Sequence, residues 1–268
     1  RQTNKKPFFL YLSLTAPHTP IAPAKEFVGK SGAGAYGDFV YQVDQVVGDI
    51  IDVLKNEKLD KNTLIIFTSD NGSPGRNGEN MNGELSSVRS LGHDPSRPWR
   101  GIKGDAWEGG HRVPFIAHWP ATIAKGNVNN ETITLADLMA TFAEIAHVEL
   151  PEQTAEDSQS LLPVLTGRKL DGPLHEAIVL HSYTGYFAIR KGDWKLIQGY
   201  GGGGISGKQE SPWFWEPEWQ LYNLKSDPGE VDNVYAKHPQ IVKELSDLLD
   251  SFKKNGRTIY RNASGDRI

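Results

Sequence analysis

Two adjacent side chains, Asp70 and Asn71, follow a run of apolar residues and present oxygen atoms that a cation could bind. The stretch TLIIFTSDNG, residues 63–72, passes from an apolar segment straight into an acid, an amide and a glycine. Carboxylate and amide oxygens are typical ligands of Ca²⁺ and Mg²⁺, which take about six or more oxygens. We therefore predict a site for a hard cation that is completed by substrate, water or other parts of the protein.

A tight turn is the alternative interpretation of residues 70–72, because Asn-Gly is the strongest short signal for a β-hairpin. In a hairpin both flanks would alternate between apolar and polar residues, and the second strand would follow at once. Here the residues before Asp70 are uniformly apolar, and those after Gly72 form a long polar stretch. The pattern favours a strand that ends at the ligand-binding edge of a parallel sheet.

Lys103 and His18 are the other two side chains with chemistry suited to such an edge. Lys103 lies among glycines just before a predicted strand, where a compact ammonium group suits an anionic oxygen; a solvated surface lysine is the alternative. His18 follows an apolar run and is flanked by prolines in APHTP, and an ordinary surface or core histidine remains open. Because the predicted strands run parallel, we expect both residues to converge with the Asp-Asn pair at the carboxyl ends of adjacent strands.

The composition restricts the classes of protein that these residues can serve. The chain has 268 residues, a net charge of -4 and no cysteine, which excludes disulfides, thiol nucleophiles and thiolate metal sites. Positive and negative charges are mixed without the basic stripe of a nucleic-acid-binding protein. No apolar run approaches the ~18 residues of a membrane-spanning helix. The length suits one large domain or two unequal ones.

Alternating strand and helix patterns predict the elements that position the candidate residues, and they indicate a doubly wound α/β core. Continuous apolar runs predict buried strands at residues 7–15, 63–69 and 112–120. Helical spacing of apolar residues predicts helices at 38–58 and 135–147, with Asp38 as the N-cap of the first. The polar stretch 72–110 is too long for a simple connection and is predicted to be functional or disordered.

The sequence pattern changes near residue 160, and we predict two domains, residues 1–159 and 160–268. Short strands separated by turns predict a small antiparallel sheet formed by EAIVLHS, YFAIRKG, DWKLIQG and WQLYNL. A glycine-rich loop before the last strand carries Trp213, Phe214 and Trp215. The chain then forms an amphipathic helix that we expect to stop at Gly256.

Four segments resemble successive motifs of the sulfatase family, in the family's order: FFLYLSLTAPHTPIAP, TLIIFTSDNG, RGIKGDAWEGGHRVPFIAHWP and WQLYNLKSDPGEVDN. The resemblance covers nearly the whole chain and corresponds to the carboxyl-terminal portion of a typical sulfatase. It implies an alkaline-phosphatase-like α/β fold, with a mostly parallel sheet, followed by a small four-stranded antiparallel sheet with a helix. The implied activity is hydrolysis of a sulfate ester of an aryl compound or a carbohydrate.

The resemblance also implies roles for individual residues. Asp70 and Asn71 match two calcium ligands of the family. His18 and Lys103 match the residues that bind the sulfate group and assist departure of the alcohol oxygen. His181 lies where sulfatases often close over the substrate, although a satisfied core histidine is an equal alternative.

Three other residues are expected to be structural. Asp137 falls where the family often places a helix aspartate. Glu108 and Arg112 are interpreted as an ion pair in a tight turn that leads into the third strand.

The family's nucleophile is not recognisable in this sequence. Sulfatases use a formylglycine made from Cys or Ser in a C/S-x-P-S/A-R motif, together with amino-terminal aspartates as further calcium ligands. HDPSR, residues 93–97, imitates the motif with His at the nucleophile position, and we regard it as a coincidence. We expect a missing amino-terminal portion to act as partner of this chain, and the chain alone to cleave no sulfate ester and to bind calcium weakly or not at all.

Two further functions remain open on the sequence alone. A phosphatase or phosphonate monoester hydrolase of the same superfamily could use the same metal, lysine and histidine. A non-catalytic fragment could bind carbohydrate through Trp213, Phe214, Trp215 and Trp219, although these aromatic residues could equally pack the small domain. Sulfatases commonly act outside the cytosol, so the resemblance suggests a periplasmic, secreted or lysosomal protein.

Overall fold

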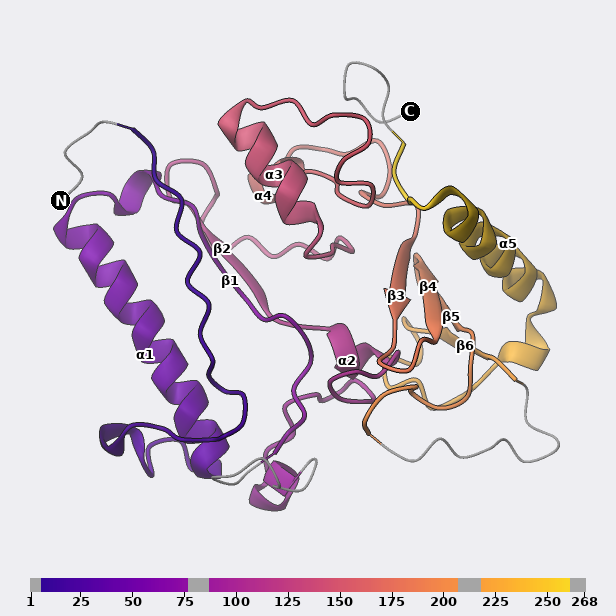
Figure 1. Cartoon of the computed structure of the whole chain (residues 1–268), viewed down its shortest axis with the longest axis horizontal. Helices are drawn as coiled ribbons and strands as arrows, with labels where there is room; N and C mark the ends of the chain where they lie inside the picture. The colour runs from indigo at the N-terminus through magenta and orange to yellow at the C-terminus, as the bar shows by residue number, and fades with distance from the viewer. Residues whose placement is uncertain (1–5, 77–86, 207–217, 261–268) are drawn as a thin grey trace. The chain divides into compact units, whose positions relative to one another are not determined.

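A computed structural model describes residues 6–76, 87–206 and 218–260. They divide into two compact units (Figure 1), and we describe each by itself. The first unit comprises the described residues of 1–56 and 75–94, and the second those of 57–74 and 95–268. The short 3₁₀ helices are η1 (Lys25–Phe27), η2 (Asp60–Asn62), η3 (Ser87–Leu91) and η4 (Tyr235–Lys237).

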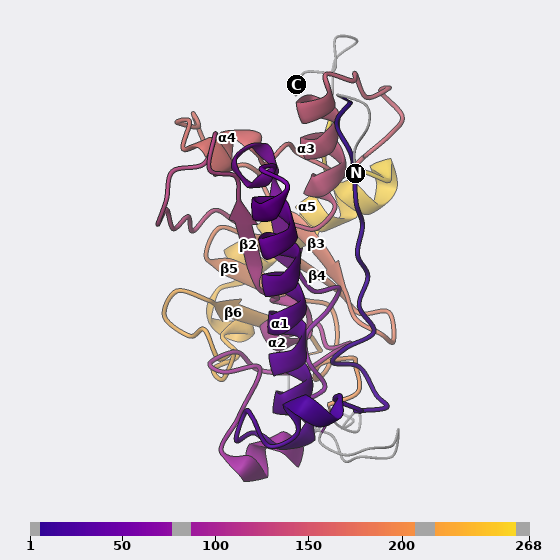
Figure 2. The same cartoon turned by 90° about the vertical axis from the view of Figure 1, so that its left-hand side faces the viewer.

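The first unit is built on α1 (Gly34–Asn56), which runs as one unbroken helix (Figures 1 and 2). The predicted N-cap role of Asp38 is wrong, because the helix begins four residues earlier. The Asp38 carboxylate instead accepts hydrogen bonds from the backbone N–H groups of Gly29, at 2.7 Å, and Ser31, at 2.9 Å. It therefore ties the preceding loop onto the first turns of the helix.

The strand predicted at residues 7–15 is also wrong, because this segment is irregular in the structure. Its apolar side chains lie largely in solvent, with Phe9 72% and Tyr11 81% exposed. A strand needs a hydrogen-bonded neighbouring strand, and the two sheets of the described residues do not include this segment. The apolar run marks a sequence with strand propensity but without the pairing that would make it a strand.

The second unit begins with a pair of short strands, β1 (Ile65–Thr68) and β2 (Phe115–His118), which pair antiparallel and not parallel as predicted. The physical reason lies in the connection, which folds back at the end of β1. There the N–H of Gly72 donates a hydrogen bond of 2.9 Å to the carbonyl of Gly110. The carboxyl end of β1 and the segment that precedes β2 therefore lie at the same edge. Because the partner strand begins only at Phe115, residues 70–72 are not the turn of a tight hairpin, and that alternative is wrong.

The four-stranded antiparallel sheet predicted in the second half of the chain is confirmed, with the strands in sequence order. It consists of β3 (Ile178–His181), β4 (Phe187–Lys191), β5 (Trp194–Ile197) and β6 (Gln220–Asn223). Trp213, Phe214 and Trp215, in the loop before β6, lie outside the described residues.

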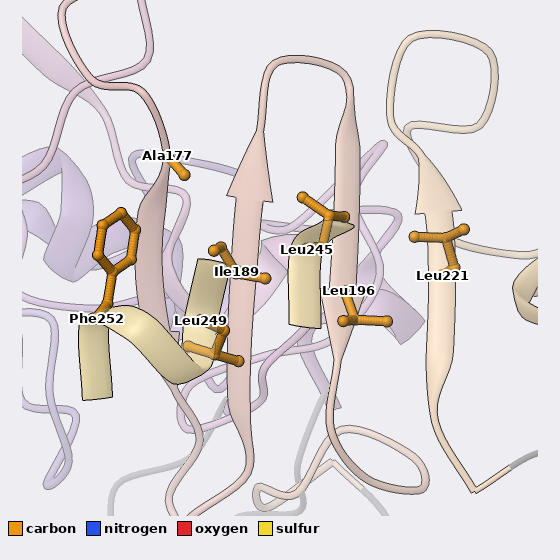
Figure 3. Close-up of a cluster of buried hydrophobic side chains, with 7 residues drawn as sticks. All are labelled: Ala177, Ile189, Leu196, Leu221, Leu245, Leu249 and Phe252. Carbon is orange, nitrogen blue, oxygen red and sulfur yellow. The ribbon is translucent and has the colours of Figure 1, made fainter. Parts of the chain in front are cut away.

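The helix α5 (Pro239–Asn255) packs its apolar side against this sheet and ends, as predicted, before Gly256, which adopts a left-handed φ of 65°. Figure 3 shows the buried side chains that form this core, contributed by the strands, the residue before β3 and α5: Ala177, Ile189, Leu196, Leu221, Leu245, Leu249 and Phe252. This core fixes the sheet on which part of the candidate site rests.

The helix predicted around residue 140 is α3 (Asp137–Ala146), and the short α4 (Leu162–Thr166) follows it. Asp137 is fully buried and accepts hydrogen bonds from the backbone N–H groups of Thr134, at 2.7 Å, and Gln159, at 2.8 Å. These bonds join the start of the helix to two loops, so the expected structural role of Asp137 is confirmed. The predicted domain boundary at residue 160 stays a prediction. Within the described part of the chain, no helix is both long and apolar enough to cross a bilayer.

Candidate active site

Glycines bring three backbone segments into direct contact at the edge where β1 ends. The short helix α2 (Glu108–His111) contains Gly109 and Gly110. A Cβ atom on Gly72 would overlap the carbonyl oxygen of Gly109, and one on Gly110 would overlap that of Asp105. Only glycine permits this approach. The end of β1 and the loop that carries Lys103 are therefore both packed against α2.

Asp70 and Asn71 lie at this edge with their oxygens accessible. Asp70 is exposed and Asn71 is half-buried. The amide nitrogen of Asn71 donates to Asp70 Oδ1 at 3.3 Å, which orients the amide so that its oxygen remains an acceptor. The donor atoms fit a hard cation in kind. They do not fit in number, since the described residues contain no group of three or more His, Cys, Asp or Glu side chains placed to bind a metal ion.

Lys103 is half-buried and lies in a loop whose two sides are joined by hydrogen bonds between Asp105 and Ile102. Asp105 is 1% exposed, and its Oδ2 accepts a hydrogen bond of 2.8 Å from the N–H of Ile102. The Asp105 N–H in turn donates to the Ile102 carbonyl at 3.0 Å. The loop is thus a closed turn whose shape does not depend on the lysine, and the ammonium group is carried on a rigid support.

The same loop is bonded to one end of the four-stranded sheet. The N–H of Tyr183, in the β3–β4 turn, donates to the Gly104 carbonyl at 2.8 Å. The N–H of Ala106 donates to the Gly202 carbonyl at 2.6 Å, in the glycine-rich loop after β5. Lys103 is therefore held between β1, α2 and this end of the small sheet.

His181 ends strand β3, two residues before the Tyr183 contact. Its side chain is exposed, and its ring meets the edge of Phe187 with the centroids 4.9 Å apart. The alternative of a satisfied core histidine is therefore wrong. The position of His181 next to the turn that contacts the Lys103 loop is compatible with contact to a substrate, and that role stays a prediction.

His18 belongs to the first unit, so its predicted convergence with the other residues stays a prediction. Its side chain is exposed, and Nδ1 lies 2.7 Å from the carbonyl oxygen of Thr19. Because a carbonyl only accepts, Nδ1 is the protonated nitrogen of the ring. In the neutral ring, Nε2 is then the nitrogen that can exchange a proton with a substrate.

A buried charge cluster beneath α2 is the part of the site region that the sequence did not predict. Lys195, on β5, is fully buried with its Nζ 3.0 Å from Glu108 Oε1 and 3.0 Å from Glu230 Oε1. Glu108 also pairs with Arg112 at 3.1 Å, as expected, and with Arg190 at 3.2 Å. The predicted tight turn around Glu108 is instead helix α2. The cluster fastens this helix, and with it the two glycines under β1, to strands β4 and β5.

The two carboxyl groups of the cluster have pKa values that are shifted in opposite directions. Burial raises the pKa of Glu108, but the nearby His111, 3.8 Å away, and the charges of Lys195 and Arg190 outweigh it and hold the pKa well below its usual range. For Glu230, burial outweighs the attraction of Lys195 and raises the pKa. Glu108 is the firmly ionised member, and Glu230 is the one that most readily takes a proton.

Comparison with known proteins identifies the family to which this arrangement belongs. The sulfatase family model matches residues 1–148, and the model of the carboxyl-terminal region of N-sulphoglucosamine sulphohydrolase matches residues 103–255. The chain belongs to the sulfatase family, and the predicted resemblance is confirmed. Its fold is part of the alkaline-phosphatase-like α/β fold, with the small antiparallel sheet and helix described above.

Particular relatives support this assignment. The chain is 38% identical over 256 residues to N-acetylgalactosamine-6-O-sulfatase of Bacteroides thetaiotaomicron, covering 93% of this chain and 48% of that protein. It is 32% identical over 243 residues to N-acetylgalactosamine-6-sulfatase of Mus musculus, covering 90% of this chain and 41% of that protein. The chain thus spans about half the length of the curated relatives it matches.

Solved structures agree with the sequence relatives. A structure from work on the metabolism of multiple glycosaminoglycans by Bacteroides thetaiotaomicron matches with a TM-score of 0.79 and 36% identity, over 93% of this chain and 51% of the other. The crystal structure of Ps i-CgsB in complex with k-i-k-neocarrahexaose matches with a TM-score of 0.72 and 27% identity, over 93% of this chain and 51% of the other.

Proposed function

We propose that the protein containing this chain is a sulfuric ester hydrolase that removes sulfate from a sulfated carbohydrate. The observation that carries the proposal is the packing of two segments against α2: the end of β1, with its adjacent oxygen ligands, and the loop with Lys103. A cation site and an ammonium group on segments that pack against the same helix suit a sulfate monoester, whose single negative charge is shared by three oxygens. Names of the relatives, which include N-acetylgalactosamine-6-sulfatases, support a sulfated hexosamine as substrate.

Each candidate residue has a distinct task in this proposal. The Lys103 ammonium binds a sulfate oxygen and offsets the negative charge that develops on the leaving oxygen. In its imidazolium form, His18 gives the proton on Nε2 to that oxygen as the bond to sulfur breaks, so the product leaves as a neutral alcohol and the ring returns to its neutral form. His181 contacts the substrate beyond the sulfate group.

Calcium is the cation we propose for the Asp70 and Asn71 oxygens, which would supply two of its ligands. When bound, such a cation acts as a Lewis acid toward the sulfate oxygens. The remaining ligands and the formylglycine nucleophile would lie in an amino-terminal portion of the protein, since this sequence has no cysteine and no recognisable C/S-x-P-S/A-R motif. That portion is the partner we propose for this chain.

The test compares this chain with the complete protein, using a chromogenic aryl sulfate and calcium. We expect turnover only from the complete protein. In that protein, Lys103→Ala and His18→Ala should each lower kcat by about 100-fold or more, the usual loss for an acid–base or charge-stabilising group. Lys125→Ala, which removes an exposed lysine, is the matched control and should leave kcat unchanged.

Thermal unfolding separates catalysis from folding in the same variants. Both catalytic substitutions should leave the melting temperature nearly unchanged, because each replaced side chain serves the substrate and not a core. Loss of the folded state in either variant, with full activity per folded molecule, would show a structural role instead. Calorimetric titration of Asp70→Ala in the complete protein should show loss of calcium binding.

A further inference from the structure

A large cavity lies at the end of the small sheet that is opposite to the candidate active site. The β3–β4 turn at residues 182–186 bonds to the Lys103 loop, whereas the β4–β5 turn at Gly192 and Asp193 lies at the far end of the same strands. The cavity has a volume of about 1010 Å³ and is bounded by this second turn, by residues 159–176 and by α5. It is therefore separate from the Lys103 loop and from His181, which lie at the other end of the sheet.

The lining of this cavity, which we call the β4–β5 cavity, is apolar within and acidic at the rim. Trp194, Ile241 and Leu245 supply apolar surface. Among the residues that line the cavity, carboxylates outnumber cationic groups four to one: Asp171, Glu176, Asp193 and Glu244 against Lys191.

The Lys191 ammonium is already engaged, at 3.3 Å from Glu176 and 3.0 Å from Glu244. The rim therefore repels anions such as a sulfated sugar and attracts cations.

An adjoining small cavity contains a buried hydrogen-bond acceptor that lacks a partner. This cavity, of about 200 Å³, shares Glu176 and Asp193 with the larger one and is lined also by His175. The His175 side chain is only 2% exposed, and its Nε2 lies 3.0 Å from both carboxylate oxygens of Asp137. Its Nδ1 has no hydrogen-bond partner among the described residues.

The tautomer of His175 follows from this geometry. A carboxylate only accepts hydrogen bonds, so Nε2 carries the proton and Nδ1 of the neutral ring presents a lone pair. A buried acceptor without a partner is unfavourable unless water or a ligand donates to it. The two cavities together thus offer apolar walls, carboxylates and one buried acceptor, and the guanidinium of Arg190, which lines the smaller cavity, is paired with Glu108 at 3.2 Å.

We propose that these two neighbouring cavities, which share lining residues, form an accessory binding site for a small organic cation, a protonated amine with an apolar body. The ammonium group donates hydrogen bonds to the carboxylates shared by the two cavities or to His175. The apolar body contacts Ile241, Leu245 and the Trp194 ring, whose face also attracts a cation. The buried amide nitrogen of Gln159, on the wall of the larger cavity, lacks a partner among the described residues, so an additional oxygen on the amine would strengthen binding.

The experiment uses this chain and two probes that differ in charge, 4-phenylbutylamine and 4-phenylbutyrate, in calorimetric titrations. We expect the amine to bind and the carboxylate not to bind. The double variant Glu176→Gln with Asp193→Asn should weaken amine binding about fivefold, as for loss of a half-exposed ion pair. The control, Glu149→Gln with Glu152→Gln, makes the same charge change at exposed positions that do not line the cavity, and it should leave affinity unchanged.

A spectrum locates the bound amine. Trp194→Phe identifies the indole N–H signal of Trp194 in a ¹H–¹⁵N correlation spectrum, and that signal should shift when the amine is added to the unaltered chain. No binding of the amine, equal binding of both probes, an equal effect of the two double variants, or an unmoved Trp194 signal would each overturn the proposal. None of these outcomes bears on sulfate hydrolysis, so the two proposals fail separately.

Discussion

Substitution of Lys195 by methionine tests the claim that the buried charge cluster fastens α2 to the small sheet. Methionine fills nearly the same volume but removes the ammonium group that lies 3.0 Å from Glu108 and 3.0 Å from Glu230. Glu108 keeps Arg112 and Arg190 as partners. Glu230 loses its only ion-pair partner among the described residues, so the cost arises there.

The size of the effect follows from this asymmetry. Removing one partner of a buried ion pair destabilises a protein by about 3–5 kcal/mol. We expect the lower end, about 3 kcal/mol, because Glu230 can take up a proton and so avoid an unpaired buried charge, and burial already raises its pKa. Because the folded-state pKa of Glu230 is raised, the folded protein binds this proton more tightly than the unfolded chain does, and its stability rises as the pH falls toward the ordinary pKa of 4.5. The stability loss of Lys195→Met should therefore be smaller at pH 5 than at pH 7.

Urea denaturation of the chain at pH 7 measures this change directly. With a slope of about 2 kcal/mol per molar urea, the unfolding midpoint should fall by about 1.5 M. The double variant Lys195→Met with Glu230→Gln removes one charge of each sign and should recover at least half of the loss. A loss below about 1 kcal/mol, or no recovery in the double variant, would refute the proposed anchoring role.

Four further substitutions, one of them a control, test other parts of the structure. Burial lowers the pKa of His111 because it outweighs the attraction of Glu108, so the folded state should lose stability as the pH drops below about 6.5. In urea titrations from about pH 7 to pH 5, His111→Gln should make this loss of stability smaller. Gly72→Ala should destabilise the protein by about 1–3 kcal/mol because the added Cβ meets the backbone of Gly109. Gly48→Ala, in open space on α1, should instead stabilise it by about 0.5–1 kcal/mol. Equal effects of the two variants in thermal unfolding would contradict the close packing of Gly72 against α2. Leu249→Ala should cost about 2–5 kcal/mol by opening the core of the small sheet, and a change below 1 kcal/mol in urea would contradict its full burial.

Elements whose patterns are local were predictable from the sequence. The four strands of the small sheet and α5 follow from alternation, helical spacing and a glycine stop, each read within one segment. Asp70, Asn71 and Lys103 could be chosen because their residue types follow or precede apolar runs, and their shared role in a site stays a prediction.

Features that depend on distant partners were not predictable. The direction of β2 relative to β1 depends on contacts outside both strands, such as the hydrogen bond between Gly72 and Gly110, which no pattern inside either strand reveals. Residues 7–15 have the composition of a strand, yet pairing decides whether a strand forms. Lys195 was missed because its partners, Glu108 and Glu230, are far from it in sequence. The one indication in the sequence was that a lysine stands within an apolar strand segment, where a buried charge needs a partner.

Parallel assays of the complete protein with 4-nitrophenyl sulfate and 4-nitrophenyl phosphate test the central claim most directly, because both esters release the same phenol and differ only in the transferred group. We predict calcium-dependent turnover of the sulfate ester, little turnover of the phosphate ester, and loss of the sulfatase activity in Lys103→Ala. Faster hydrolysis of the phosphate ester, or sulfate hydrolysis that survives Lys103→Ala unchanged, would contradict the account.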